Sequence, residues 1–312
     1  MRFVMDKVKI HALVESLIRL IRQANGDLLV LFPIQRYISM LDSQNLHGHY
    51  GNIPASASSY SKQIDKLPGN GLMEMYHKLV LVTLIGDFDA RLSKRKLPNS
   101  VIELFHNEFS RIADDISRQE DSYYVTSNDL YLKDLAICRL KLYPCGPELV
   151  DELSGISRKI IISGNIGQFR RATRFFLLRG HKFRPYYELH MHAPLREHFH
   201  PDGWIACYRR IAELLELNQE LEGVICSSWW YDPQLETVSP RLNYLRRFLV
   251  ENGAELFYVK SDINAAGGAI EKSATRRRLL ESGEYVPHIY TAIWPRFELI
   301  RWANTFGKKE NE

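Results

Sequence analysis

Cysteine is scarce in this chain. The four cysteines, Cys138, Cys145, Cys207 and Cys226, are too widely spaced for a zinc knuckle and too few to cross-link a chain of 312 residues. We therefore expect reduced thiols, as in a cytoplasmic protein. Cys226 lies inside a short apolar run, so we expect it in the core rather than as a nucleophile.

Long apolar runs and a strong excess of one charge are also missing. No stretch approaches the ~18 consecutive apolar residues that a membrane span needs, and residues 1–9 carry charges where a secretory apolar region would lie. The 41 Lys and Arg residues only slightly outnumber the 37 Asp and Glu residues, and they are spread along the chain. We expect no membrane partner, and nucleic-acid binding is not indicated.

Hydrophobic residues, by contrast, make up 45% of the chain, which is enough to bury a sizeable core. In the first third, apolar residues recur at three- and four-residue intervals near 10–21 and 101–116, which predicts helices, and a further helix is expected over 72–92. We expect residues 1–130 to form a mainly helical N-terminal region.

One segment of that region has a different composition. Residues 42–70 are rich in Ser, Gly, Asn and Pro, which predicts a long loop. Such a loop is too long for a plain connector, so we expect a lid over the pocket mouth, with Tyr50 or Tyr60 touching the ligand.

From about residue 135, strand-like and helix-like patterns alternate. This alternation predicts an α/β (or α+β) fold: a mixed, centrally parallel sheet with helices on its faces. We expect residues 131–312 to form this α/β domain and to carry the functional site. The expected strands cover 136–143, 159–163, 184–192, 223–230, 256–260 and 287–294, and the expected helices cover 167–179, 202–217, 240–251 and 268–282.

The densest chemistry in the chain is the run Glu188-Leu189-His190-Met191-His192. On a strand, Glu188, His190 and His192 share one face, while Leu189 and Met191 occupy the other. One of these histidines could act as a general base oriented by Glu188. The same three side chains are alternatively ligands for Fe or Zn, because two histidines and a carboxylate converge without any loop folding.

Two loops that lead into helices are candidate anion sites, because helix N-termini present unpaired N–H groups and a positive dipole end. The first loop carries Arg196, His198, His200 and Gly203, and its alternative interpretation is that Asp202 simply caps the helix.

The second loop contains Gly164 and Gly167 and is followed by Arg170. Its spacing matches neither a Walker loop nor a dinucleotide fingerprint, and an ordinary strand-to-helix turn with solvated arginines is the alternative. Aromatic residues 229–231 end an expected strand, where they could wall a pocket or pack in the core.

The stretch from about 184 to 260 resembles the core of the GNAT acyltransferases in the order of its elements. The resemblance is carried by Val224 to Trp230, Pro240-Arg241-Leu242-Asn243-Tyr244-Leu245 and Glu251-Asn252-Gly253-Ala254-Glu255-Leu256-Phe257. It implies that the pyrophosphate of acyl-CoA binds the loop at 196–203. The chain departs from the family's glycine-rich signature, since Gly203 is the only glycine in that loop.

The sequence therefore predicts a cytoplasmic group-transfer enzyme, an acyltransferase with a His general base and a phosphate-bearing cosubstrate such as acyl-CoA. Two alternatives stay open: a metal-dependent hydrolase or oxygenase using Fe or Zn, and a non-enzymatic anion-binding or regulatory module. In each case the partner is an anionic or phosphate-bearing small molecule. We expect the pocket at the carboxyl ends of strands 184–192 and 223–230, which should be neighbours in the sheet.

Overall fold

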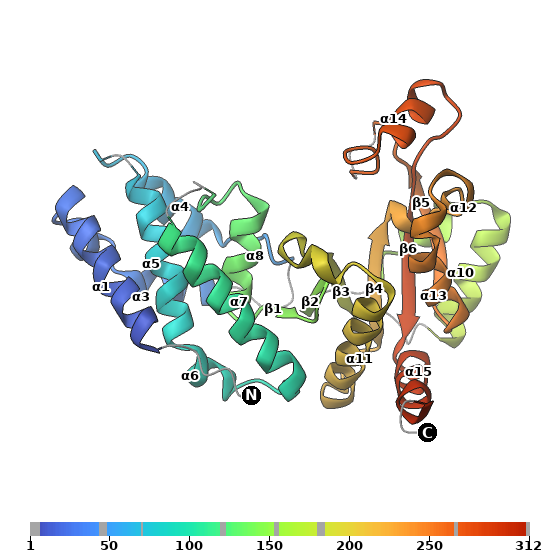
Figure 1. The fold of residues 1–312 in the computed structure, drawn as a ribbon, viewed down its shortest axis with the longest axis horizontal. Coiled ribbons are helices and arrows are strands. Elements are labelled where there is room, and N and C mark those ends of the chain that lie inside the picture. The colour runs from blue at the N-terminus through green and yellow to red at the C-terminus, as the bar shows by residue number, and fades with distance from the viewer. Residues whose placement is uncertain are drawn as a thin grey trace. The chain divides into compact units, whose positions relative to one another are not determined.

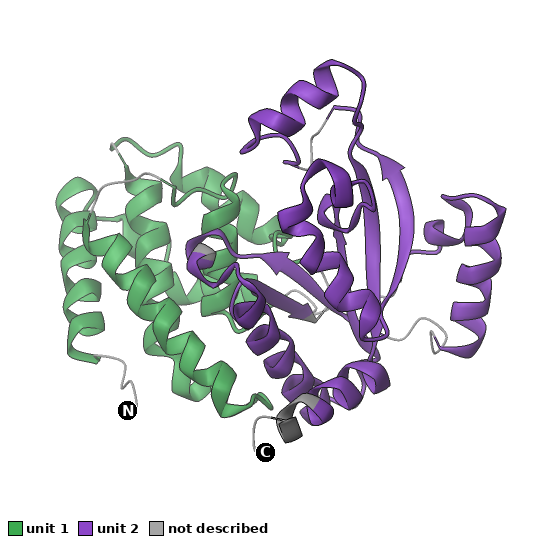
Figure 2. Cartoon of the chain, turned by 45° about the vertical axis from the view of Figure 1, so that its right-hand side comes forward, with its two compact units in different colours: residues 1–145 green, residues 146–312 purple. Residues whose placement is uncertain are grey.

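The computed structural model describes residues 7–43, 49–69, 71–118, 123–152, 156–179, 185–264 and 268–309. The chain divides into two compact units, unit 1 over residues 1–145 and unit 2 over residues 146–312 (Figure 2). In the described residues, unit 1 is built of helices and ends in one short strand, whereas unit 2 combines strands and helices.

Unit 1 is organised around helix α5, in which apolar residues occur on every side and most are buried. A helix that is hydrophobic all round belongs in a core, and most other helices of the unit pack against it (Figure 1). The predicted helices near 10–21 and 101–116 are confirmed, whereas the single helix expected over 72–92 is divided at Asp87 into two helices. The helices of unit 1 are α1 (Lys7–Ala24), α2 (Leu28–Leu31), α3 (Ile34–Asp42), α4 (Ala55–Ile64), α5 (Leu72–Gly86), α6 (Phe88–Leu92), α7 (Asn99–Arg118) and α8 (Asp129–Cys138).

The prediction of an uninterrupted loop over residues 42–70 is wrong, because α4 lies within it. Ala57, Tyr60 and Ile64 recur at helical spacing and are buried. The Tyr60 hydroxyl donates to the Pro33 carbonyl at 3.3 Å, and the Tyr50 hydroxyl donates to Asp129 Oδ1 at 2.5 Å. Both tyrosines therefore bond within unit 1. Residues 44–48 and 70 lie outside the described part, and the lid role stays a prediction.

The strand predicted over 136–143 is also wrong for most of its length. Residues 136–138 end α8, and only Leu142–Pro144 form a strand, β1. The last five residues of α8 are all buried, so polar and apolar residues do not alternate there with the period of a helix. Leu140 follows with a φ of 56°, a left-handed conformation that stops the helix.

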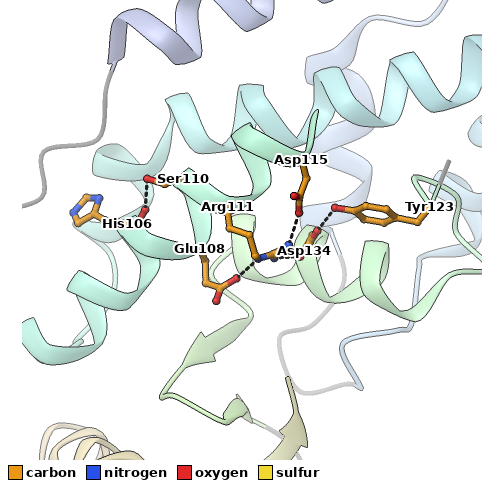
Figure 3. A network of polar contacts seen from close by, with 7 residues as sticks. All are labelled: His106, Glu108, Ser110, Arg111, Asp115, Tyr123 and Asp134. Atoms are coloured by element: carbon orange, nitrogen blue, oxygen red, sulfur yellow. Dashed lines mark hydrogen bonds and ion pairs between the residues drawn. The ribbon is translucent and has the colours of Figure 1, made fainter. Parts of the chain in front are cut away.

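A polar network joins α7 to α8 within unit 1 (Figure 3). The Arg111 guanidinium donates to Glu108 at 2.9 Å, to Asp115 at 3.1 Å and to Asp134, whose side chain is fully buried. Tyr123 donates its hydroxyl proton to the other Asp134 oxygen at 3.1 Å. Although burial opposes the charge of Arg111, the carboxylates of Asp134 and Glu108 raise its pKa. The guanidinium thus stays ionised inside the helix pair.

The strands form a six-stranded mixed sheet in the order β1-β2-β3-β4-β6-β5. Strands β3 and β4, in the middle of this order, run parallel, while β2 with β3, β4 with β6 and β5 with β6 are antiparallel. The expected α/β class and the expected pairing of the two central strands are confirmed. The strands after β1 are β2 (Glu148–Glu152), β3 (Tyr187–Met191), β4 (Gly223–Ser228), β5 (Glu255–Ser261) and β6 (His288–Pro295).

One face of the sheet in unit 2 is covered by helices α9 and α10. Phe175 of α10 packs with Ile225, Phe257 and Ile293 in a buried cluster. On the other face, Trp294 contacts aromatic rings of α11, α13 and α15. The described helices of unit 2 are α9 (Lys159–Ile162), α10 (Ile166–Leu178), α11 (Pro201–Leu217), α12 (Leu235–Val238), α13 (Asn243–Glu251), α14 (Ala274–Glu281) and α15 (Arg296–Lys309), with 3-10 turns at Ala193–His198, Trp229–Tyr231 and Pro240–Leu242.

Most of the predicted elements of this unit are confirmed, with two exceptions. Residues 159–162 form a helix, α9, instead of a strand, because a short apolar run alone does not separate the two structures. Helix α14 is confined to Ala274–Glu281, and residues 265–267 lie outside the described part.

The side chain of Gln168 in α10 forms hydrogen bonds with the backbone of strand β5. The Gln168 amide nitrogen donates to the Tyr258 carbonyl at 2.8 Å, and the Tyr258 N–H donates to the Gln168 carbonyl oxygen at 2.8 Å. Arg171 adds a bond to the Leu256 carbonyl at 2.7 Å. These bonds fix the start of α10 against β5. Over the whole described part of the chain, no helix is long and apolar enough to cross a membrane.

Candidate functional site

The titratable side chains of strand β3 lie on one face, as the alternation of residues in the sequence predicts. Tyr187 and Leu189 are buried, whereas Glu188 and His190 on the opposite side are partly accessible. Burial raises the pKa of the Glu188 carboxyl. Met191, which the alternation assigns to the same face as Leu189, is 45% exposed at the end of the strand.

Asp151 on β2 joins this face, and the sequence patterns did not reveal it. The antiparallel register sets Asp151 directly opposite Glu188, so the two carboxylates share a side of the sheet. Asp151 is fully buried, and its Oδ2 lies 3.9 Å from His190 Nε2. An imidazole beside a buried carboxylate is oriented by it and is stabilised when it takes up a proton.

His192 differs from His190 in its surroundings. It lies just beyond the end of β3, is fully buried, and its backbone N–H donates to the Pro147 carbonyl at 3.0 Å. Within the residues that the structure describes, no group of three or more His, Cys, Asp or Glu side chains is placed to hold a metal ion. The interpretation of Glu188, His190 and His192 as Fe or Zn ligands is therefore not supported.

The two central strands part toward their carboxyl ends. Their register joins Tyr187 to Val224 and Glu188 to Ile225. Beyond these pairs, the rest of β3 still pairs with β2, and the rest of β4 still pairs with β6. In the described residues the two strands thus share only a short stretch of register, and a weak bond from Cys226 Sγ to the Leu189 carbonyl at 3.8 Å lies where they separate. A parting of this kind leaves strand edges facing one another.

The loop between β3 and α11 begins with the 3-10 turn Ala193–His198 and ends at the helix start. The His200 ring is the helix cap: its Nδ1 accepts the Gly203 N–H at 3.2 Å. The expected alternative, a cap by Asp202, is wrong, because Asp202 lies one position inside the helix. Gly203 is required sterically, since a Cβ there would lie 2.1 Å from the His198 carbonyl oxygen.

Glu197 and His198 of this loop lie at the surface. His198 Nε2 is 3.7 Å from Glu197 Oε1, and both side chains are exposed. The side chain of Arg196 is outside the described part. Phe199 contacts Trp230 with ring centroids 6.0 Å apart, and Trp204 contacts the same ring at 6.0 Å. The start of α11 therefore lies beside the carboxyl end of β4, next to the parting of the strands.

A cavity of about 680 Å³ opens at the start of α10 and along β5 and β6. Gly164 and Gly167 of the predicted glycine loop line this cavity. The exposed Arg170 does not line it, but the next residue, Arg171, does. Asn165 caps α10 by accepting the Gln168 N–H at 2.9 Å. The full lining is Ser163, Gly164, Asn165, Gly167, Gln168, Arg171, Pro233, Arg246, Leu256, Tyr258 and Tyr290.

The cavity wall combines two guanidinium groups with two phenols. Arg246 is bonded to Glu236 at 2.7 Å, and the Tyr258 and Tyr290 rings meet edge to face at 5.7 Å. Burial raises the pKa of Tyr290, so its hydroxyl is a proton donor at neutral pH. In the register Tyr290 lies opposite Ser228, the last residue of β4. The cavity therefore lies at the carboxyl end of β4, on the side of β4 away from β3.

Asp232 fixes the segment that leaves β4 to the start of β6. Its carboxylate is buried and accepts the backbone N–H groups of His288 at 2.8 Å and of Gln234 at 3.0 Å. The two predicted tryptophans have different contacts. Trp230 packs on α11, and the Arg276 guanidinium lies 4.6 Å from the centroid of the Trp229 ring. Arg246, Tyr258, Tyr290 and Asp232 were missed from the sequence, since no local motif unites them.

Comparison with known proteins supplies a fold likeness. No protein-family model matches the chain, and no curated protein sequence matches it. The chain is similar to the crystal structure of an acyltransferase in complex with CoA and 10C-teicoplanin, with a TM-score of 0.52, 13% identity, and coverage of 88% of this chain and 80% of that one. It is equally similar to an acyltransferase in complex with decanoyl-CoA and teicoplanin, with a TM-score of 0.52, 14% identity and the same coverage. The chain therefore has an acyltransferase-like fold.

Proposed function

We propose that this protein is an acyltransferase that uses acyl-CoA as its cosubstrate. The observation that carries the proposal is the parting of β3 and β4 beside Glu188 and His190, with the start of α11 packed against the end of β4. The fold likeness to acyltransferases crystallised with CoA and decanoyl-CoA supports it. The order β3, α11, β4, α13 and β5 also fits the GNAT type that the sequence resembles.

The cosubstrate in this proposal extends from α11 into the parted strands. Its phosphates bind at the loop 196–203, which carries Arg196 and His198 in its sequence and leads into the first turn of α11. The pantetheine arm carries amide groups, and an extended chain with amides can hydrogen-bond to exposed strand edges as an added strand does. The thioester then lies beside the face that carries Glu188 and His190.

In the chemical step, an amine or hydroxyl group of the acceptor attacks the thioester carbonyl carbon. A C–N or C–O bond forms, the C–S bond breaks, and the CoA thiolate leaves. His190 takes the proton of the nucleophile, and Asp151 and Glu188 stabilise the resulting imidazolium. His190 suits this role better than His192, because its side chain is 11% exposed while His192 is fully buried.

The test begins with binding and then asks for turnover. We expect CoA and decanoyl-CoA to bind in isothermal titration calorimetry, and we expect release of the CoA thiol from decanoyl-CoA with at least one member of a panel of amines and alcohols. Absence of CoA binding would contradict the proposal. Binding without thiol release from any acceptor would instead identify an anion-binding module.

A single variant locates the phosphates. Arg196→Ala should weaken CoA binding by about 10- to 100-fold, the usual effect of losing one charge-assisted hydrogen bond. It should leave the weaker binding of pantetheine, which lacks the phosphates, unchanged. Arg247→Ala is the matched control, because Arg247 is an exposed arginine on α13 that bonds only locally to Glu251 among the contacts described. Equal losses in both variants would place the phosphates elsewhere.

A further inference from the structure

The outward side of α9 and α10 carries large exposed apolar side chains. These are unusual on a helix whose other side is already packed on the sheet, because large apolar side chains gathered on one surface indicate an interaction site. The exposed fractions are 76% for Ile162, 74% for Ile166, 49% for Phe169, 78% for Leu177 and 68% for Leu178.

Helical geometry puts these residues on one side of α10. At 100° per residue, Ile166 and Leu177 lie opposite the buried Ala172 and Phe175, and Phe169 lies at the margin of this side, about 60° from Ala172. The exposed Arg170 and Arg174 lie next to Leu177 on the same side. The outward side of α10 is therefore apolar and basic together, and we call it, with Ile162 of α9, the α9–α10 outer face.

The charge around this face has a single sign. Residues 156–179 contain Arg158, Lys159, Arg170, Arg171, Arg174 and Arg179 and no acidic residue, although the whole chain is nearly balanced in charge. Arg171 and Arg179 are occupied at the sheet, where they bond to the Leu256 carbonyl and to Glu255 and Glu298. The other four basic residues are exposed. Positive charge thus borders the apolar side chains without acidic neighbours in the segment.

We infer that the α9–α10 outer face docks on an anionic lipid surface. Apolar side chains of an interfacial helix enter the boundary between headgroups and acyl chains, while flanking arginines bond to lipid phosphates. An anionic bilayer offers both an apolar interior for the apolar side chains and phosphates for the arginines, and it binds them without a groove of complementary shape. The inference departs from the expectation of no membrane partner, because that expectation addressed only segments that span a bilayer. It does not depend on the proposed acyl transfer, although Gly167 and Arg171 at the start of α10 line the cavity.

The experiment is flotation of the full chain with lipid vesicles. We expect binding to vesicles of equal parts phosphatidylcholine and phosphatidylglycerol, little binding to phosphatidylcholine alone, and loss of binding as salt rises. Arg170→Glu with Arg174→Glu should lower partitioning by about 25-fold or more, at about fivefold for each basic residue removed. Leu177→Ser with Leu178→Ser should lower it by roughly tenfold or more.

Two control variants match these changes. Val8→Ser with Val30→Ser removes two similarly exposed apolar side chains from unit 1, and Arg247→Glu reverses an exposed charge on α13. Both should bind vesicles as the unchanged chain does. Failure of the unchanged chain to bind anionic vesicles would overturn the inference, as would equal losses in control and test variants. Concentration-dependent self-association that the test variants abolish, without vesicle binding, would assign the face to a second copy of the chain.

Discussion

Replacement of His190 tests the proposed chemistry most directly, because β3 offers matched controls on adjacent positions. His190 is partly accessible beside the buried Asp151 carboxylate, and Leu189, its neighbour, is buried on the opposite face. His190→Gln keeps a polar side chain of similar reach but cannot accept a proton. Leu189→Ala removes apolar packing and leaves the proposed base in place.

The expected magnitudes separate the two variants. Loss of a general base costs about 10²- to 10⁴-fold in kcat, which corresponds to about 3–5 kcal/mol of activation free energy. Since Gln keeps a polar side chain of similar size beside Asp151, His190→Gln should change the free energy of unfolding by only about 1 kcal/mol. Leu189→Ala should lower the free energy of unfolding by about 2–5 kcal/mol, because truncation of a buried leucine leaves a cavity.

The assays are thermal or urea unfolding, calorimetric CoA affinity and thiol release from decanoyl-CoA. Met191→Ala on the same strand is a second control, and we expect little effect on either property since Met191 is 45% exposed. Thiol release that survives in His190→Gln would refute its role as base. A large loss of stability in His190→Gln, with normal stability in Leu189→Ala, would show that the face assignment is reversed.

Three further predictions concern stability and the loop. Burial lowers the pKa of His77 from its ordinary value of 6.5 to about 4. As the pH falls from 6.5 toward 4, the unfolded chain takes up a proton at His77 and the folded chain does not, so the free energy of unfolding falls by about 3 kcal/mol. Urea unfolding should show this fall, and His77→Gln should lack it. Asp134→Ala removes one of the two buried carboxylates that bond to Arg111, while Glu108 remains, and should lower the free energy of unfolding of unit 1 by about 1–3 kcal/mol in calorimetry. Gly203→Ala forces a Cβ against the His198 carbonyl and should lower stability by about 1–3 kcal/mol and weaken CoA binding, whereas Gly86→Ala, which meets no atom within 4 Å, should do neither in the same assays.

Long periodic segments and strong end signals made much of unit 2 predictable. Helix α13 ends as predicted near Gly253, whose φ of +101° suits glycine. The alternation in β3 correctly assigned Glu188 and His190 to the face opposite Leu189. Element order along the chain then sufficed to predict that β3 and β4 are neighbours.

Other features depend on tertiary structure and leave no local pattern. The end of α8 is buried and has no polar side, and α9 contains a short run of three isoleucines, so the hydrophobic pattern of neither segment distinguishes helix from strand. Asp151 reaches the His190 face through a strand that was not predicted. The cavity gathers Gly164, Arg246 and Tyr290 from distant parts of the chain, and a single sequence does not encode such pairings in any short motif.

The bonds between Gln168 and β5 have a consequence for solubility. Strand β5 ends the order of the sheet, and an edge strand offers its backbone N–H and C=O groups to the strands of other molecules. The Gln168 side chain is itself an amide, and it occupies both backbone groups of Tyr258 as a neighbouring peptide would. Arg171 occupies a further carbonyl and adds a charge beside it. The two side chains thus occupy the middle of the outer edge of β5, where an added strand would need the same backbone groups.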